Sequence, residues 1–163
     1  MPIVGGPLCC DWGRLAPGPR DQRKVEDRND VLVYTTPAFT RETEVTGPIS
    51  LDLFAATSKE DTDFTAKLLD VWPDGFAQNL TEGILRLRFR NSVERAEPAK
   101  PGEVYHLVLD LWATSNVFLP GHRLRLEISS SNFPRFAHRG RFRHRCTDGL
   151  SHHPSALLLP IVP

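Results

Sequence analysis

Apolar and polar residues alternate with a period of two over several stretches of the chain. Strict alternation places every second side chain on the same face of an extended strand, so each stretch predicts a strand with one buried and one wetter face. The segments with this pattern are Val45–Leu53, Leu85–Arg90, Tyr105–Leu111 and Leu124–Ile128. Less regular apolar runs add three candidate strands, Val31–Thr35, Phe64–Trp72 and Ala156–Ile161.

Turn signals separate these candidate strands. Proline presets φ and glycine accepts positive φ, so their combinations favour tight turns. They occur at Gly47-Pro48, Pro73-Asp74-Gly75, Pro98 to Gly102 and Pro120-Gly121. No long segment has a helical period. The sequence therefore predicts an all-β fold, a jelly-roll β-sandwich like the galactose-binding domains, with about eight or nine antiparallel strands.

Residues 1–30 differ from the rest because they are rich in proline, glycine and charged residues. Prolines remove ladder donors and glycines favour turns, so this segment predicts an irregular N-terminal arm that lies over another surface. Residues 31–163 are predicted to form the sandwich. Within them, the basic run Phe136–Arg145 has little periodicity and predicts a loop.

Charge and cysteine content narrow the choice of partners and compartment. Lysine plus arginine and aspartate plus glutamate each number 20, so the net charge of zero favours neither nucleic acid nor an anionic membrane as partner. No apolar run approaches the ~20 residues of a membrane helix, and the first residues lack the pattern of a secretory signal. Adjacent Cys9 and Cys10 bridge only with strain, so reduced thiols and a cytoplasmic location are predicted.

The sequence offers little catalytic or metal-binding chemistry. An α/β-hydrolase nucleophile needs a Gly-x-Ser-x-Gly elbow, and in the nearest match, residues 149–153, His153 replaces the second glycine. Ser151 is therefore interpreted as a plain loop serine. The residues with zinc-ligand chemistry fit no familiar zinc spacing; they are His138, His144, Cys146, His152 and His153. We predict no catalytic residue, no metal and no cofactor in this chain.

Two other groups of residues have structural alternatives. The arginines of residues 135–145, with Phe136 and Phe142, could bind phosphates and stack on bases, but the rest of the chain balances their charge. Asp63 and Asp70 have opposite parity on their predicted strand, so they should point to opposite faces. That parity argues against a paired acid–base site and favours turn hydrogen bonds and buried ion pairs.

A series of sequence blocks follows one another in a recognisable order. The blocks include Arg28 to Thr36, Glu44 to Ile49, Asp61 to Val71, Pro73 to Gly75, Gly83 to Arg86, Ala113 to Phe118, Pro120 to Arg123, Ser129 to Pro134 and His153 to Ser155. Together they resemble the C-terminal domain of the X-Pro dipeptidyl-peptidase and CocE/NonD family of serine hydrolases. The similarity runs from about Pro2 to Pro134 and returns near the end of the chain.

The resemblance implies an accessory domain. Full enzymes of this family have an α/β-hydrolase domain with a Ser-His-Asp triad, a helical cap and the jelly roll last, so the triad belongs to a part absent here. The implied partner is an α/β-hydrolase catalytic domain, either on a separate chain or lost, and a homo-oligomer is a further option. The first loop of the jelly roll borders the acyl pocket in such enzymes, which makes Leu8, Cys9 and Cys10 candidates for the pocket wall. The alternative is that both cysteines are small buried hydrophobic residues.

One segment departs from the family pattern. After Phe136 the chain continues with residues 137–140, and a longer family insert is much shortened, as a deletion or a shifted reading frame across residues 137–150 would leave it. Two alternatives to the accessory domain follow. A truncated gene remnant would leave the arm with nothing to lie on. A freestanding carbohydrate- or small-ligand-binding module could stack sugars on Trp12, Trp72 and Trp112, although core or rim packing is the more frequent use of such residues.

Overall fold

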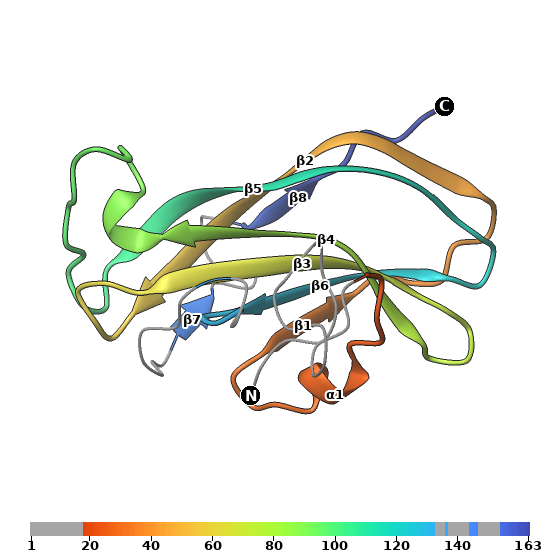
Figure 1. Ribbon diagram of the computed structural model, residues 1–163, viewed down its shortest axis with the longest axis horizontal. Helices are drawn as coiled ribbons and strands as arrows, with labels where there is room; N and C mark the ends of the chain where they lie inside the picture. Colours follow the sequence, from red (N-terminus) through yellow and green to blue (C-terminus); the bar gives the residue numbers. More distant parts are fainter. Residues whose placement is uncertain (1–17, 133–135, 137–143, 147–153) are drawn as a thin grey trace.

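A computed structural model describes residues 18–132, 136, 144–146 and 154–163 of the chain. Two antiparallel sheets face each other and enclose one core (Figure 1). In the first sheet the strand order is β1-β6-β3-β4, and in the second it is β5-β2-β7, with β8 also paired to β2. The predicted all-β sandwich is therefore confirmed.

The strands vary in length from three residues to fifteen. The first sheet contains β1 (Leu32–Thr35), β6 (Arg123–Ser129), β3 (Asp63–Val71) and β4 (Ala77–Arg86). The second contains β5 (Val104–Phe118), β2 (Thr43–Thr57), β7 (His144–Cys146) and β8 (Ala156–Leu158). The described helical elements are α1 (Arg23–Glu26) and the 3-10 turn η1 (Leu87–Phe89).

Alternation along the strands fills the core as predicted. The second sheet points its odd-numbered apolar residues inward, and β3 and β6 point their even-numbered ones inward, because side chains of an extended strand alternate between its faces. The core includes Val45, Ile49, Leu51, Leu53, Leu107, Leu109 and Leu111 from the second sheet and Phe64, Ala66, Leu68, Leu124, Leu126 and Ile128 from the first.

A bulge lets β5 extend well beyond the predicted end at Leu111. Two residues of β5, Leu111 and Trp112, lie opposite Ile49 alone, since Pro48 pairs with Ala113 and the next ladder partners are Ser50 and Asp110. The extra residue reverses the parity of the strand. Phe118, an even-numbered residue, is consequently buried at its far end.

The interiors of the two sheets meet closely beside this bulge. The hydroxyl of Thr81 on β4 donates a hydrogen bond to the carbonyl oxygen of Leu111 on β5. Gly83 lies directly against the backbone of Asp110, whose carbonyl oxygen occupies the space that a β-carbon would need. Only glycine therefore fits at this point of β4.

Two predictions of secondary structure were wrong. The segment Leu85–Arg90 was expected to be a strand, but β4 ends at Arg86 and η1 follows. The chain turns there because Asp61 accepts a hydrogen bond from Arg86 Nε at 2.9 Å and another from the backbone N–H of Arg88 at 3.3 Å. The end of the run predicted as a loop forms β7, which pairs with residues 55–57 of β2.

Residues 18–31 lie against the first sheet. The backbone N–H of Gln22 donates to the carbonyl of Ala77 at 2.9 Å, and Asp21 bridges to Gln78, so this segment follows the free edge of β4. Helix α1 then lies below the outer face of the sheet (Figure 1). All nine residues of β3 are buried, on both of its faces.

Candidate functional site

Several residues singled out from the sequence lie outside the described part of the chain. They are the pocket-wall candidates Leu8, Cys9 and Cys10, the serine at 151, and the histidines at 138, 152 and 153. His144 and Cys146 belong to β7. Within the described residues, no group of three or more histidine, cysteine, aspartate or glutamate side chains is placed to hold a metal ion.

A polar cavity of about 340 Å³ opens between β4 and β5. Its walls in the described chain are residues 18–19, 78–80 and 114–116, which present amides and hydroxyls and no charged side chain. Asn79 is fixed there because its Oδ1 accepts a hydrogen bond from the backbone N–H of Arg20 at 2.8 Å. Such a cavity can hydrogen-bond a neutral polar group, but these walls offer no acid, base or nucleophile.

A histidine–carboxylate pair is buried at the same end of the sandwich. His122 Nδ1 lies 2.8 Å from Oδ1 and 3.0 Å from Oδ2 of Asp70. Burial raises the pKa of Asp70 above its ordinary value, although the hydrogen bond with His122 acts in the opposite direction. The amide of Asn116 also helps to lower this pKa, yet its buried Nδ2 makes no hydrogen bond of normal geometry within the described residues.

The two predicted carboxylates serve separate ion pairs. Asp63 lies 3.5 Å from Arg86, whereas Asp70 engages His122. No paired acid–base site forms between them, in agreement with their opposite parity. A second histidine pair, His106 Nε2 with Asp52 at 3.1 Å, lies on the exposed side of the second sheet.

The two described tryptophans lie in different parts of the sandwich. Trp72 follows β3 and packs edge-on against Phe76, with ring centroids 5.2 Å apart, and lies 5.7 Å from the ring of His122. Trp112 lies within β5 and is 66% exposed. Rim packing was correct for Trp72, but Trp112 neither ends its strand nor packs in the core.

A buried polar cluster occupies the outer face of the first sheet, beneath residues 18–31. Lys67 Nζ donates to Oε1 of Gln22 at 2.9 Å, and Asn132 Nδ2 donates to Oε2 of Glu82 at 2.6 Å. In the strand register, Lys67 of β3 lies opposite Glu127 of β6 on one side and opposite Glu82 of β4 on the other. The ammonium group therefore lies between two carboxylates. Sequence alternation assigned Glu127 to the wetter face of its strand and gave no sign that other chain segments cover it.

The charges of this cluster influence one another. Burial lowers the pKa of Lys67, while the carboxylates of Glu127 and Glu82 act to raise it. Burial raises the pKa of Glu127 to about 7, against the attraction of Lys67 and with added repulsion from Glu26. Glu26 in turn accepts a hydrogen bond from Arg125 Nη1 at 2.6 Å. The cluster thus ties α1 to strands β3 and β6.

Stability is expected to fall as the pH rises from about 4.5 to about 7. Glu127 has an ordinary pKa of 4.5 and a folded value of about 7, so in this window the folded chain retains a proton that the unfolded chain releases. The loss should be on the order of 2 kcal/mol, with a plateau above pH 7. Urea unfolding at a series of pH values measures it.

The variant Glu127→Gln is the matched control, because the amide keeps the shape of the side chain and cannot ionise. The fall in stability between pH 4.5 and 7 that Glu127 causes should be absent from this variant. At pH 8 the variant should be more stable than the native chain. Parallel pH profiles for the two proteins would show that Glu127 does not titrate in this window.

No helix in the described residues is long and apolar enough to cross a membrane.

The two facing sheets define a β-sandwich domain. Comparisons with known proteins identify its family. The family of the X-Pro dipeptidyl-peptidase C-terminal non-catalytic domain matches residues 3–148. Cocaine esterase of Rhodococcus sp. (strain MB1 Bresler) is 43% identical over 176 residues, which cover 99% of this chain and 30% of that protein. A putative serine esterase of Mycobacterium bovis, Mb1866c, is 33% identical over 132 residues, or 71% of this chain and 21% of that protein.

Solved structures agree. An aminopeptidase from a marine sediment Thaumarchaeota archaeon superposes with a TM-score of 0.81 at 32% identity over 89% of this chain and 28% of its own. An α-amino acid ester hydrolase gives a TM-score of 0.79 at 28% identity over 88% of this chain and 27% of its own. This chain belongs to the X-Pro dipeptidyl-peptidase C-terminal non-catalytic domain family. It spans less than a third of the length of each of these four relatives.

Proposed function

We propose that this chain is the accessory domain of a serine hydrolase that cleaves acyl esters, amides or X-Pro peptides, and that it carries no catalytic triad of its own. In this role it stabilises and shapes an active site that lies on an α/β-hydrolase domain. The relatives named as esterases, an ester hydrolase and an aminopeptidase support the hydrolase context.

The arrangement around His122 is the observation that carries this proposal. A triad needs a histidine with a carboxylate on one ring nitrogen and a serine hydroxyl on the other. His122 has its carboxylate, Asp70, on Nδ1. In the described part of the chain, no hydroxyl or thiol hydrogen-bonds to the ring of His122 or to that of His106. The geometry therefore favours structural ion pairs.

The purified chain is expected to release no product from p-nitrophenyl esters or from Ala-Pro-nitroanilide above the rate of buffer. A full-length serine esterase of the family, assayed alongside, is the positive control. Turnover that a serine-directed inhibitor abolishes would contradict the proposal, and the variant Ser151→Ala would then identify whether the serine at 151 is responsible.

A further inference from the structure

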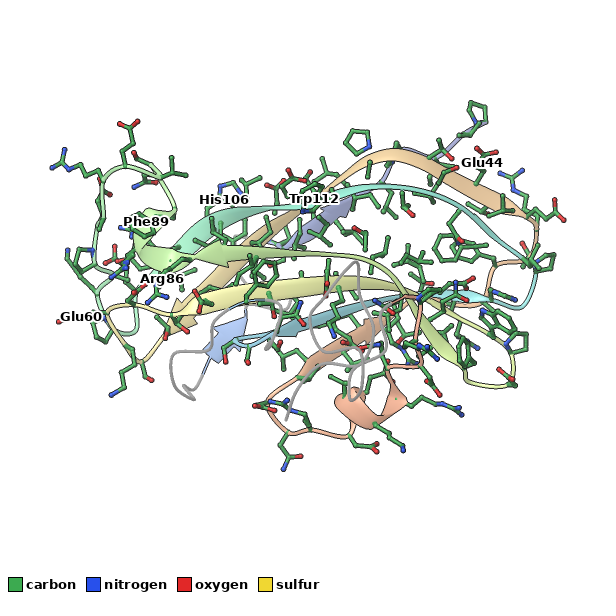
Figure 2. The ribbon with its side chains drawn as sticks, in the orientation of Figure 1. Glu44, Glu60, Arg86, Phe89, His106 and Trp112 are labelled. Carbon is green, nitrogen blue, oxygen red and sulfur yellow. The ribbon has the colours of Figure 1, made fainter. Side chains whose placement is uncertain are left out.

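Buried charged side chains attach residues 18–31, which we call the covering segment, to the first sheet. Helix α1 of this segment lies on the side of the sandwich away from Trp112 on β5 (Figure 2). Glu26 of α1 reaches β6, where its Oε2 accepts a hydrogen bond from Arg125 Nη1 at 2.6 Å. Glu127 lies two residues along β6 and therefore shares the outer face of that strand with Arg125. The side chain of Glu26 is only 12% exposed and Glu127 only 3%.

One oxygen of each of these two glutamates lacks a hydrogen-bond donor. Oε1 of Glu26 and Oε1 of Glu127 are both buried, and no donor in the described residues hydrogen-bonds to either of them. The two carboxyl groups instead hydrogen-bond to one another. An ionised carboxylate only accepts hydrogen bonds, so two ionised groups cannot make this contact. One proton held between Glu26 and Glu127 supplies the donor that the contact needs.

The cations nearest to this glutamate pair are shared with other groups. Lys67 of β3 lies opposite Glu127 in the strand register, but on its other side it lies opposite Glu82 of β4. Arg125 is hydrogen-bonded to Glu26. Two cations thus face three carboxylates in this part of the described structure. A proton on the glutamate pair reduces the excess of negative charge.

The other neighbours of the pair bring no further positive charge to it. On β1, which borders β6 on its other side, Val33 lies opposite Glu127. Arg28 of the covering segment influences Lys67, but it is paired with Asp30 at 2.6 Å. The glutamate pair is therefore more easily balanced by a proton than by any of these side chains.

We propose that the covering segment is a pH-sensitive latch: it is closed on β3 while Glu26 and Glu127 share a proton, and it opens once that proton is lost. The loss leaves two adjacent buried anions, whose repulsion and desolvation act directly across the contact between α1 and β6. Opening exposes the outer face of β3, whereas the core lies on its inner face. The opening is therefore a local transition, distinct from unfolding, and it goes beyond the accessory function because it needs no catalytic domain.

The pKa of Glu127 gives the pH range of this transition. Burial raises this pKa from 4.5 to about 7 against the attraction of Lys67, and Glu26 raises it further by repulsion and by the hydrogen bond. Arg125 acts to lower it. The closed form therefore binds the proton more tightly than an open form in which the carboxyl group is in water. The contribution of the proton to closure is fully present below pH 4.5 and is lost as the pH rises to about 7.

Hydrogen exchange of the whole 163-residue chain at pH 5 and pH 8 tests the latch, with each rate divided by that of an unstructured peptide at the same pH. The reporters are the amides of residues 22–27, among which the N–H of Gln22 donates to the carbonyl of Ala77. Their protection should fall at least about tenfold from pH 5 to pH 8. At pH 8 it should also be at least about tenfold lower than the protection of β2 and β5. Protection equal to that of these core strands would mean that the segment opens only when the whole domain unfolds, and it overturns the inference.

Two variants separate the shared proton from other effects of pH. In Glu127→Gln the amide group donates to Glu26 without titrating, so protection of the covering segment should change less than about threefold between pH 5 and pH 8. Asp27→Asn removes an exposed carboxyl group directly beside Glu26 in the chain, and it should keep the full tenfold fall. A fall that persists in Glu127→Gln, or that Asp27→Asn abolishes, overturns the inference.

Nuclear magnetic resonance of the native chain gives a reading that depends on no variant. In a ¹³C titration of the glutamate carboxyl carbons, at least one resonance should have its midpoint near pH 7, well above the ordinary value of about 4.3. Addition of base through this midpoint should shift the backbone resonances of α1 together with it. A titration in which every glutamate has its midpoint below about pH 5 overturns the inference.

Discussion

Replacement of Gly83 by alanine is expected to destabilise the domain by about 3 kcal/mol, because the new methyl group would overlap the backbone of the facing sheet. A β-carbon at residue 83 would overlap the carbonyl oxygen of Asp110 and lie 3.0 Å from its carbonyl carbon. The backbone atoms of β5, which is paired along its length with β2, cannot rotate aside as the end of a side chain can. Chemical unfolding of the Gly83→Ala variant measures the loss.

Gly75→Ala is the matched control. Gly75 has a φ of +87°, but an added β-carbon would meet nothing within 4 Å. This variant should therefore lose only about 1 kcal/mol, through backbone strain alone. If Gly83→Ala proved no more damaging than Gly75→Ala, the close approach of β4 and β5 at Asp110 would be wrong.

The contact at Gly83 links the core to the exposed surface. Gly83 and Thr81 both press on the segment of β5 that ends at Trp112, so the same contacts that close the sandwich also hold the bulge. A variant that pushes Asp110 away should move Trp112 as well. The backbone position of Trp112 thus depends on how tightly the two sheets close beside it.

Alternation located the strands whose parity is uninterrupted. β2 and β6 each keep one buried face along their length, and both lie where the apolar pattern predicted them. In β5 the alternation breaks after Leu111, because the bulge inserts Trp112 as an extra residue. The sequence gave no sign of the bulge, since no glycine or proline lies there. The first eight residues of β4 were missed for a related reason: Leu80 is an extra residue in its ladder with β3, and burial on both faces removes the alternation.

Alternation also misled where local ion pairs decide the backbone path. Leu87 and Phe89 continue the period-two pattern of β4, yet Asp61 binds both Arg86 and Arg88 and the chain turns into η1. The polar cluster could not be predicted at all. Its burial depends on residues 18–31 folding back over β3. This contact joins segments that are far apart in the sequence, and no local pattern in either segment indicates it.

The replacement Lys67→Met is expected to cost about 3–5 kcal/mol at pH 8, because it leaves buried carboxylates without their counter-charge. Lys67 is only 5% exposed and lies between Glu127 and Glu82, and its Nζ also holds Gln22 of the covering segment. At pH 5 the loss should be smaller, since Glu127, with a pKa of about 7, is then protonated in the folded chain.

A double-mutant cycle isolates the charge interaction within this loss. At pH 8, Glu127→Gln should stabilise the Lys67→Met variant by at least about 1 kcal/mol more than it stabilises the native chain, because without Lys67 the charge at residue 127 has lost its compensation. Lys100→Met, at a lysine whose side chain is 86% exposed, should change stability by no more than about 0.5 kcal/mol. Additive effects of the two cluster substitutions would mean that Lys67 acts by packing and by its bond to Gln22, and that its charge interaction with Glu127 contributes little.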